Sequence, residues 1–282
     1  STMASGDTSP YVGGRDVTMM YSVVDISGIN RLSGSILSNA ASAICGMVSK
    51  PDVKMEKEKP LVGATMFGVT TPCVTRVQEI LEATGYEVLV FHATGSGGRA
   101  MEDLVRDGFM VGVLDITTTE LADELVGGVL SAGPHRLEPI GKASIPHVVV
   151  PGALDMVNFG PIDTVPERFQ SRNLYVHNPT VTLMRTTVEE NAELGRIMAN
   201  KLNQSKGPTV VAVPLKGVSA IDTLGGPFHD PQADRAWLEN LKAGLDSRVE
   251  VVEMDFHIND PEFSQRVVDL FLERMEKAIN LV

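Results

Sequence analysis

Short apolar runs rich in valine alternate with amphipathic stretches over most of this chain. The apolar runs predict strands at Leu61–Gly68, Glu87–His92, Met110–Thr117, His147–Asp155, Thr209–Gly217 and Val249–Phe256. The amphipathic stretches place apolar residues three or four positions apart, which predicts helices beginning near residues 71, 99, 118, 187, 233 and 261. Continuous apolar strands separated by helices are typical of a parallel sheet covered on both faces. We therefore predict an α/β protein with a doubly wound, mostly parallel open sheet of about six strands, Rossmann-like or flavodoxin-like.

The first part of the chain, residues 1–59, has a different pattern. Val17–Ile26 predicts a buried strand, and Gly28–Val48 predicts a helix with one apolar side and one side of small polar residues. The charged, proline-bounded run Lys50–Pro60 predicts a linker. We interpret this part as a strand, helix and linker that connect a preceding subdomain, absent from this sequence, to an α/β ligand-binding domain over residues 60–282.

Composition excludes several classes of function. The chain has 282 residues, of which 43% are hydrophobic and only 5% aromatic, which favours an α/β protein over an aromatic-rich β sandwich. A net charge of -12 argues against a nucleic-acid groove. Two cysteines do not suggest a disulfide framework, and no apolar run or leader predicts a membrane span. We expect a cytoplasmic protein without nucleic-acid or membrane partners.

The most informative motif is FHATGSGGRAMEDL, residues 91–104, where a predicted strand runs through glycines into a predicted helix. Glycines permit positive φ and a close approach of the backbone, while a helix N-terminus offers unpaired N–H groups and a partial positive charge. This arrangement predicts a phosphate cradle formed by Gly95, Ser96, Gly97, Gly98 and Arg99. The alternative is a tight turn that binds nothing, which is common in α/β folds.

Other polar residues follow strands and are therefore expected at the same edge of the sheet. Thr70, Thr71 and Thr118 are candidates to donate hydroxyls to the same anion, or to cap helices instead. Arg185 is a candidate for a forked pairing with phosphate. It follows Met156–Thr182, a long proline-containing stretch that we expect to be an irregular, mobile loop that orders over a ligand.

Catalytic and metal-binding candidates carry weaker signals. The candidate acids and bases are Asp155, His92 and His177. Cys73 lies in the first turn of a predicted helix, where a thiol pKa can fall, although a small buried residue is the competing interpretation. His229 and Asp230 are candidate ligands of a divalent ion, but two ligands do not make a site, so no metal centre is predicted.

Five long segments carry a resemblance to a known family. They are STMASGDTSPYVGGRDVTMMYSVVDISGINRLS, GATMFGVTTPCV, FHATGSGGRAMEDL, DITTTELADEL and VVVPGALDMVNFG. They resemble the tobamovirus-resistance-protein-like ATP-binding family of bacteria and plants, whose full unit has two α/β subdomains. The resemblance covers nearly the whole chain and identifies it with the second subdomain and the last part of the first. It implies ATP as ligand, with Mg²⁺, and as partners the first subdomain and a phosphoenolpyruvate-mutase-like barrel.

Three functions remain open at this point. The first is a domain that binds a nucleotide or another small phosphorylated ligand, with ATP implied by the resemblance. The second is an enzyme acting on a small phosphorylated or carboxylated metabolite. The third is a scaffold that forms homo-oligomers through the small-residue side of Gly28–Val48 and has no ligand of its own.

Overall fold

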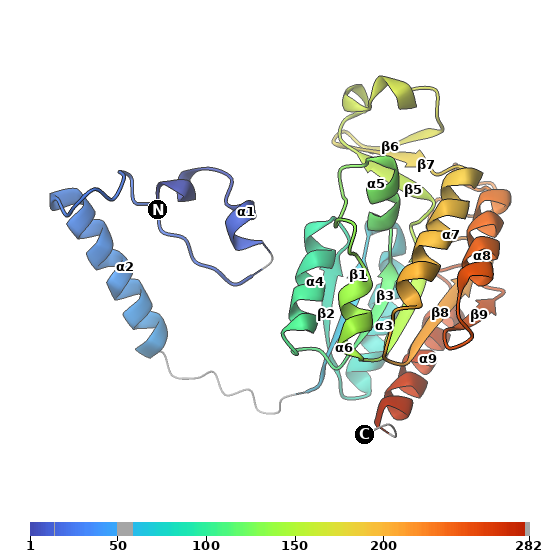
Figure 1. The fold of residues 1–282 in the computed structure, drawn as a ribbon. Helices are drawn as coiled ribbons and strands as arrows, with labels where there is room; N and C mark the ends of the chain where they lie inside the picture. Colours follow the sequence, from blue (N-terminus) through green and yellow to red (C-terminus); the bar gives the residue numbers. More distant parts are fainter. Residues whose placement is uncertain (14, 50–58, 280–282) are drawn as a thin grey trace. The chain divides into compact units, whose positions relative to one another are not determined.

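The structure is a computed structural model that describes residues 1–13, 15–49 and 59–279. The chain forms two compact units, Ser1–Glu58 and Lys59–Val282 (Figure 1). Residues 50–58 of the predicted linker lie outside the described residues. The two units are therefore considered separately.

The second unit is built on a six-stranded sheet in which every pair of neighbouring strands is parallel. Its strands are β1 Leu61–Met66, β2 Glu87–His92, β3 Gly112–Thr117, β4 His147–Gly152, β8 Thr209–Pro214 and β9 Glu250–Met254. The order β2-β1-β3-β4-β8-β9 is flavodoxin-like, which confirms the predicted fold class. The chain reverses direction across the sheet between β1 and β3, so a topological switch point lies at their carboxyl ends.

Helices cover both faces of this sheet (Figure 1). They are α3 Thr71–Ala83, α4 Ser96–Arg106, α5 Glu120–Val126, α6 Glu138–Ala143, α7 Val188–Leu202, α8 Pro231–Gly244 and α9 Pro261–Ile279. Successive strand residues point to opposite faces: Val148 and Val150 pack with α3 and α9, whereas Val149 packs with α7 and α8. Burying each such side chain contributes about 1.5–3 kcal/mol, which is why every central strand reads as a continuous apolar run.

The segment Met156–Thr182, predicted as an irregular loop, contains regular structure instead. It forms most of a three-stranded antiparallel sheet in the order β5-β7-β6, with β5 Met156–Phe159, β6 Leu174–Asn178 and β7 Val181–Arg185. Two short 3-10 turns, Ile162–Thr164 and Glu167–Phe169, lie between β5 and β6. The sequence prediction was wrong because these strands are only four or five residues long and are held by cross-strand pairing rather than by a local pattern.

In the first unit, α2 Arg31–Ser49 confirms the helix predicted over Gly28–Val48. Two short helices precede it, η1 Thr2–Ser5 and α1 Ser9–Val12. The strand predicted over Val17–Ile26 is wrong, since the structure assigns no strand to these residues. A strand is stabilised by hydrogen bonds to a neighbouring strand, and the described part of this unit contains none.

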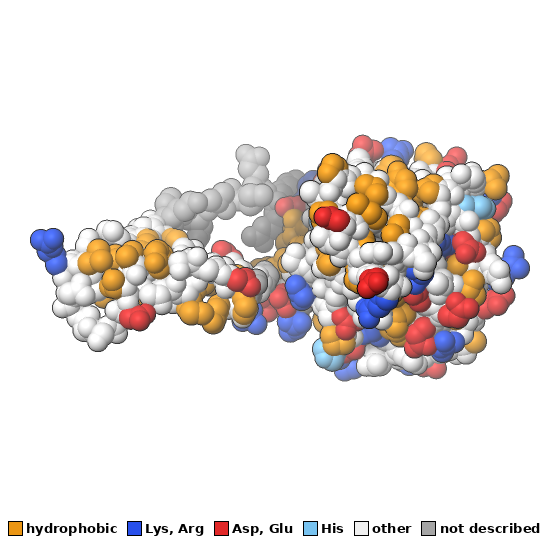
Figure 2. All heavy atoms as spheres, turned by 90° about the horizontal axis from the view of Figure 1, so that it is seen from above, with side chains coloured by type: hydrophobic (Ala, Val, Ile, Leu, Met, Phe, Trp, Pro, Cys, Tyr) orange, Lys and Arg blue, Asp and Glu red, His pale blue; other side chains and the backbone are white. Residues whose placement is uncertain are grey.

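Helix α2 is largely exposed, and Ser33 is its single buried residue. The exposed large apolar residues on and beside it are Ile29, Leu32, Leu37, Ile44, Met47 and Val48. Figure 2 shows hydrophobic side chains at the surface of this unit. Contrary to the sequence expectation, α2 is long and apolar enough to cross a membrane, and is the one such helix in the described part of the chain. Length and composition alone are weak evidence, because a helix that packs against protein passes the same test.

The sequence predicted self-association through the small-residue side of this helix. We now predict that the chain self-associates through the apolar side of α2 instead, because large hydrophobic side chains are exposed there in the unit by itself. Ala40→Glu should place a charge in that contact and shift the protein towards monomer in light scattering. Ser38→Glu, at an exposed position on the opposite side of the same helix, is the matched control and should leave the mass unchanged. A strict monomer at high protein concentration would contradict the prediction.

Candidate functional site

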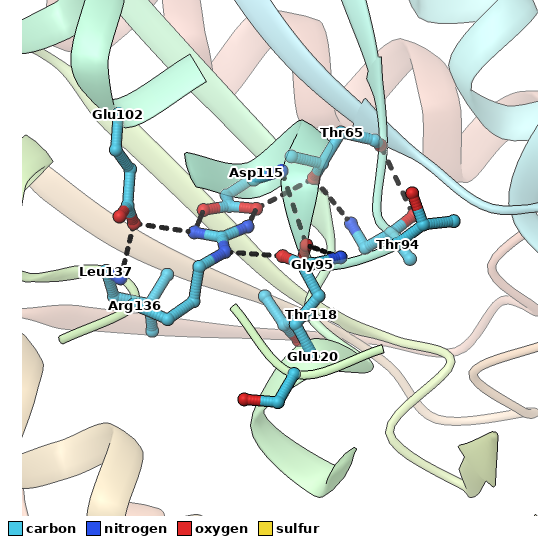
Figure 3. A network of polar contacts seen from close by, with 12 residues as sticks. Thr65, Thr94, Gly95, Glu102, Asp115, Thr118, Glu120, Arg136 and Leu137 are labelled. Carbon is cyan, nitrogen blue, oxygen red and sulfur yellow. Dashed lines mark hydrogen bonds and ion pairs between the residues drawn. The ribbon is translucent and has the colours of Figure 1, made fainter. Parts of the chain in front are cut away.

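The predicted phosphate cradle lies between β2 and α4, and α4 begins at Ser96, three residues earlier than predicted. Two of its backbone donors are already used. The Gly95 N–H donates to Oε1 of Glu120 at 2.7 Å (Figure 3). The Gly98 N–H donates to the same oxygen at 3.2 Å. Glu120 is the first residue of α5 and is fully buried. The anion held by the glycine loop is therefore a carboxylate of the chain itself.

The glycines are required by this internal packing. A Cβ on Gly97 would lie 1.9 Å from the carbonyl oxygen of His92, and a Cβ on Gly98 would lie 2.3 Å from Oε2 of Glu120. Gly95 has a φ of 83°, a backbone conformation that residues other than glycine rarely adopt. Ser96 and Arg99 are exposed, so Arg99 is the one charged group of the predicted cradle that remains open to solvent.

Arg136, which the sequence analysis did not single out, lies at the centre of a buried ionic network (Figure 3). Its guanidinium donates to both carboxylate oxygens of Asp115, each at 2.6 Å. It also donates to Glu120 at 2.6 Å and to Glu102 at 3.1 Å. Thr65, at the end of β1, donates to Asp115 on β3 at 2.7 Å. The network thus fills the switch point, where flavodoxin-like folds hold their ligands.

Burial and charge act in opposite directions on this network. Burial alone would raise the pKa of Asp115, but Arg136 and His147 together outweigh burial and hold that pKa well below its usual range. Burial alone would lower the pKa of Arg136, but Asp115, Glu120 and Glu102 raise it. For Glu102 burial dominates, and its pKa is raised. The bidentate pair therefore stays ionised at neutral pH.

The three candidate threonines point their hydroxyls inward. Thr70 shares a 2.7 Å hydrogen bond with Thr117, and Thr71 donates to the carbonyl of Phe67 at 3.2 Å. Thr118 donates to the carbonyl of Val150 at 3.1 Å. The hydroxyl of Thr70 makes no capping bond to α3, although Thr70 occupies the N-cap position. These side chains join neighbouring strands and loops to one another.

Three of the catalytic candidates have no acid or base hydrogen-bonded to them among the described residues. Cys73 is fully buried, and burial raises its pKa to about 12, so the thiol stays protonated and is a poor nucleophile. His92 is exposed at the end of β2 and stacks on Phe67, with ring centroids 5.5 Å apart. His177 is exposed on β6. None of them is hydrogen-bonded to another candidate.

Asp155 and Arg185 belong to a second buried cluster, near the carboxyl ends of β4 and β8. Arg185 donates to Asp234 at 2.7 Å, and its guanidinium lies 3.9 Å from Asp222. Asp155 accepts a hydrogen bond from Ser219 at 2.7 Å. Sequence reasoning missed Asp222 and Asp234, because one lies in the loop after β8 and the other on α8, with no local motif.

The donors of Arg185 are directed into the protein. Its Nε donates to the carbonyl of Phe228 at 2.7 Å, and its Nη1 donates to Thr186 at 3.0 Å. A ligand phosphate would have to displace Asp234 from Nη2 to reach this guanidinium. The forked phosphate contact expected of Arg185 is therefore closed in this structure.

The second cluster holds protons more readily than the first. Burial raises the pKa of Asp155 to about 7 and that of Asp234 to about 8, with the charge of Asp222 adding to both shifts and Arg185 opposing them. One oxygen of Asp155 and one of Asp222 are buried without a hydrogen-bond partner among the described residues. Three carboxyl groups thus share one guanidinium without being fully satisfied.

A cavity of about 620 Å³ lies beside this cluster, between the loop after β8 and α8. Its apolar wall includes Pro214, Leu215, Val218, Trp237 and Leu238, and its charged residues include Asp234, Arg235 and Lys242. Trp237 is 3% exposed, and its indole N–H has no acceptor among the described residues. A second cavity, of about 350 Å³, is lined by Arg185 and shares His229 with the first. Mostly apolar cavities of this size with a few polar groups are typical of small-molecule sites.

The metal candidates do not form a metal site. Asp230 caps α8, accepting hydrogen bonds from the N–H groups of Gln232 and Ala233 at 3.1 Å each. His229 is exposed at the two cavities. Across residues 1–13, 15–49 and 59–279, no group of three or more His, Cys, Asp or Glu side chains could hold a metal ion.

The structure is an α/β domain of flavodoxin-like strand order with a cavity at the carboxyl edge of its sheet. The chain belongs to the family described as Uncharacterised protein family (UPF0261). The C-terminal domain of that family matches residues 59–275, and its N-terminal domain matches residues 1–52.

The relatives that this chain matches are longer than the chain. A UPF0261 protein of Clostridium tetani is 60% identical over 98% of this chain and 69% of its own length. The ToMV resistance protein Tm-1(GCR237) of Solanum lycopersicum is 50% identical over 99% of this chain and 38% of its own length. These matches confirm the predicted family resemblance. Among solved structures, a thioesterase domain from the curacin biosynthetic pathway aligns at 11% identity, over 76% of this chain and 91% of that chain, with a TM-score of 0.36, which supports no functional comparison.

We predict that Gly97→Val lowers the melting temperature rather than altering ligand binding alone. Its side chain would collide with the backbone of His92, and overpacking of this kind costs about 1–3 kcal/mol. A melting curve should therefore shift down by about 2–10 °C. Ser96→Ala, at the exposed neighbouring position, is the control and should melt like the parent. A Gly97→Val protein that melts like the parent would contradict this account of the loop.

We also predict that the free energy of unfolding falls as pH rises from 6 to 9. Asp155 and Asp234 have pKa values raised above those of the unfolded chain, so their stabilisation is complete below about pH 4 and is lost through pH 7–8. Urea unfolding at both pH values measures the slope. Asp234→Asn should flatten it, whereas Glu239→Gln, an exposed change on the same helix, should not.

Proposed function

We propose that residues 59–279 bind a nucleotide or a similar phosphorylated metabolite in the 620 Å³ cavity beside α8. The observation that carries this proposal is that one cavity combines a mostly apolar wall, which includes Trp237, with the partly exposed carboxyl of Asp234. A ligand that brings both an apolar ring and polar groups suits such a wall.

The location of the cavity supports the proposal. It lies at the carboxyl ends of β4 and β8, which is the edge of a parallel sheet where ligands bind in doubly wound folds. In the glycine loop at β2, by contrast, the amide donors of Gly95 and Gly98 are committed to Glu120. A phosphate there would have to displace a fully buried carboxylate.

Charge at the cavity wall gives the phosphate a place. Arg235 is exposed, lines the cavity and has no ion-pair partner among the described residues. The other two cations of the wall are already paired, Lys216 with Asp255 at 2.9 Å and Lys242 with Glu253 at 2.5 Å. Arg235 is therefore the side chain most available for a charge-assisted hydrogen bond to a ligand phosphate.

ATP is the nucleotide that the family resemblance implies, and Mg²⁺ would enter with it, coordinated mainly by the phosphates. The relatives that this chain matches are longer than the chain. Contributions from the rest of the N-terminal domain, and from a phosphoenolpyruvate-mutase-like barrel, belong to the same proposal. So does the cytoplasmic location expected from composition.

A second candidate function is acid–base catalysis on the bound ligand. Asp234 favours it, because its carboxyl lines the cavity and has a pKa raised to about 8, near the range in which a general acid or base works best. Asp155, the earlier candidate, is 1% exposed and does not line the cavity. In this function Asp234 would exchange the proton, and Asp155 and Asp222 would tune its pKa.

Calorimetric titration of the chain with ATP, AMP and inorganic phosphate tests the proposal. Arg235→Ala should weaken AMP and ATP binding about tenfold or more, the loss of one charge-assisted hydrogen bond. Arg99→Ala is the matched control, an equally exposed arginine at the glycine loop, and should leave binding unchanged. The reverse pattern would place the ligand at the glycine loop. Absence of binding by every nucleotide would refute the proposed function.

A further inference from the structure

Asp234 presents one unused carboxylate oxygen to the cavity. Its Oδ1 accepts from Arg185 at 2.7 Å, while its Oδ2 accepts no hydrogen bond from any described residue. The side chain is 27% exposed, although its neighbours in the cluster are almost fully buried. The carboxyl group is thus fixed at one oxygen and available at the other.

The surroundings of Asp234 determine which kind of ligand group can approach that oxygen. The groups around it are Asp155 after β4, Arg185 at the end of β7 and Asp222 in the loop after β8. With Asp234 itself, the cluster therefore has three carboxyl groups and one cation. Asp155 and Asp222 each keep one buried oxygen without a partner. This part of the wall repels a phosphate or a carbonyl oxygen and attracts a hydrogen-bond donor.

Arg235 and Asp234 are consecutive on α8, so their side chains leave the helix about 100° apart. A ligand that holds its phosphate at Arg235 therefore has another part of the molecule available to Asp234. For a nucleotide, that part is the base, lying along the apolar wall formed by residues such as Leu215 and Leu238.

We propose that Asp234, in its ionised form, selects nucleotides whose base carries an exocyclic amino group over the corresponding nucleotides that carry an oxo group. This inference rests on the proposed function, because it assigns the specificity of the same cavity. The amino group donates to Oδ2, whereas an oxo group in the same place sets two acceptor oxygens against each other in a poorly hydrated wall. The base that carries the oxo group has to shift before its neighbouring ring N–H can donate to Oδ2. Sites built to hydrogen-bond a ligand group discriminate strongly against analogues that leave it unpaired.

The test compares AMP with IMP, and CMP with UMP, by calorimetric titration of the full chain. The members of each pair differ in one amino or oxo group and in the ring nitrogen beside it, which accepts a hydrogen bond next to the amino group and carries a proton next to the oxo group. The titrations are run at pH 9, above the raised pKa of Asp234, so that the carboxylate is ionised. We expect the amino member of at least one pair to bind tenfold or more tightly than its oxo partner, with the phosphate contact at Arg235 common to both.

Asp234→Asn gives the decisive variant. Its amide oxygen can still accept from Arg185, while its NH₂ group donates towards the cavity, so the preference should fall to unity or reverse in favour of the oxo ligand. Glu239→Gln loses a carboxylate of the same cavity outside the cluster and should keep the parental preference. A melting curve of each variant establishes that it is folded.

The outcomes separate this inference from the proposed function. Equal binding of both members of each pair by the parent protein, with Arg235→Ala still weakening them, overturns the role of Asp234 and leaves the cavity as the binding site. An unchanged preference in folded Asp234→Asn overturns it as well. Absence of nucleotide binding by the parent protein overturns the proposed function itself. The comparison on the parent protein needs no variant, so poor folding of Asp234→Asn does not remove the test.

Discussion

The guanidinium of Arg136 joins the parts of the domain that meet at the centre of the sheet edge. It connects Asp115 on β3, Glu102 on α4 and Glu120 on α5 through hydrogen bonds of 2.6–3.1 Å. Through Glu120 it also fixes the glycine loop after β2. Each of these charged groups is buried, and the cost of removing it from water is offset only because its oppositely charged partners are present. Removing one partner from such a pair typically costs about 3–5 kcal/mol, because the remaining charge is left without compensation.

This interaction also determines where a ligand can bind. In open α/β sheets the switch point is the usual binding site, and here it lies between β1 and β3. The chain fills that place with its own side chains. The carboxylate of Glu120 occupies the position of a phosphate, because it accepts from glycine amides at the start of a helix and from Arg136. The cavity that remains lies further along the same edge, at β4 and β8, where a tryptophan and an acidic cluster form the wall.

Two buried arginines thus have opposite roles in one domain. Arg136 and Arg185 are each surrounded by three acidic side chains. Around Arg136 each acidic side chain accepts a hydrogen bond from the guanidinium, and the pKa of Asp115 is held below its usual range. Around Arg185 the pairing is incomplete, carboxylate oxygens are left unpaired, and Asp234 reaches a cavity. Complete satisfaction stabilises the fold, whereas incomplete satisfaction leaves groups free for chemistry or recognition.

The sequence by itself determined the parallel sheet, because buried strands must be apolar throughout and the helices that cover them must be amphipathic. It also determined which loops lie at the carboxyl edge, since each follows a strand. Only the tertiary structure decided what occupies that edge. Glu120 lies 25 residues from Gly95 in sequence and Asp234 lies 49 residues from Arg185, so no local pattern could pair them. The same holds for the sheet formed by β5, β6 and β7. The periodicity of apolar residues indicates which side of a helix or strand is buried. It does not indicate which distant charged residue will lie against a given loop, and the hydrogen bonds between elements depend on that contact.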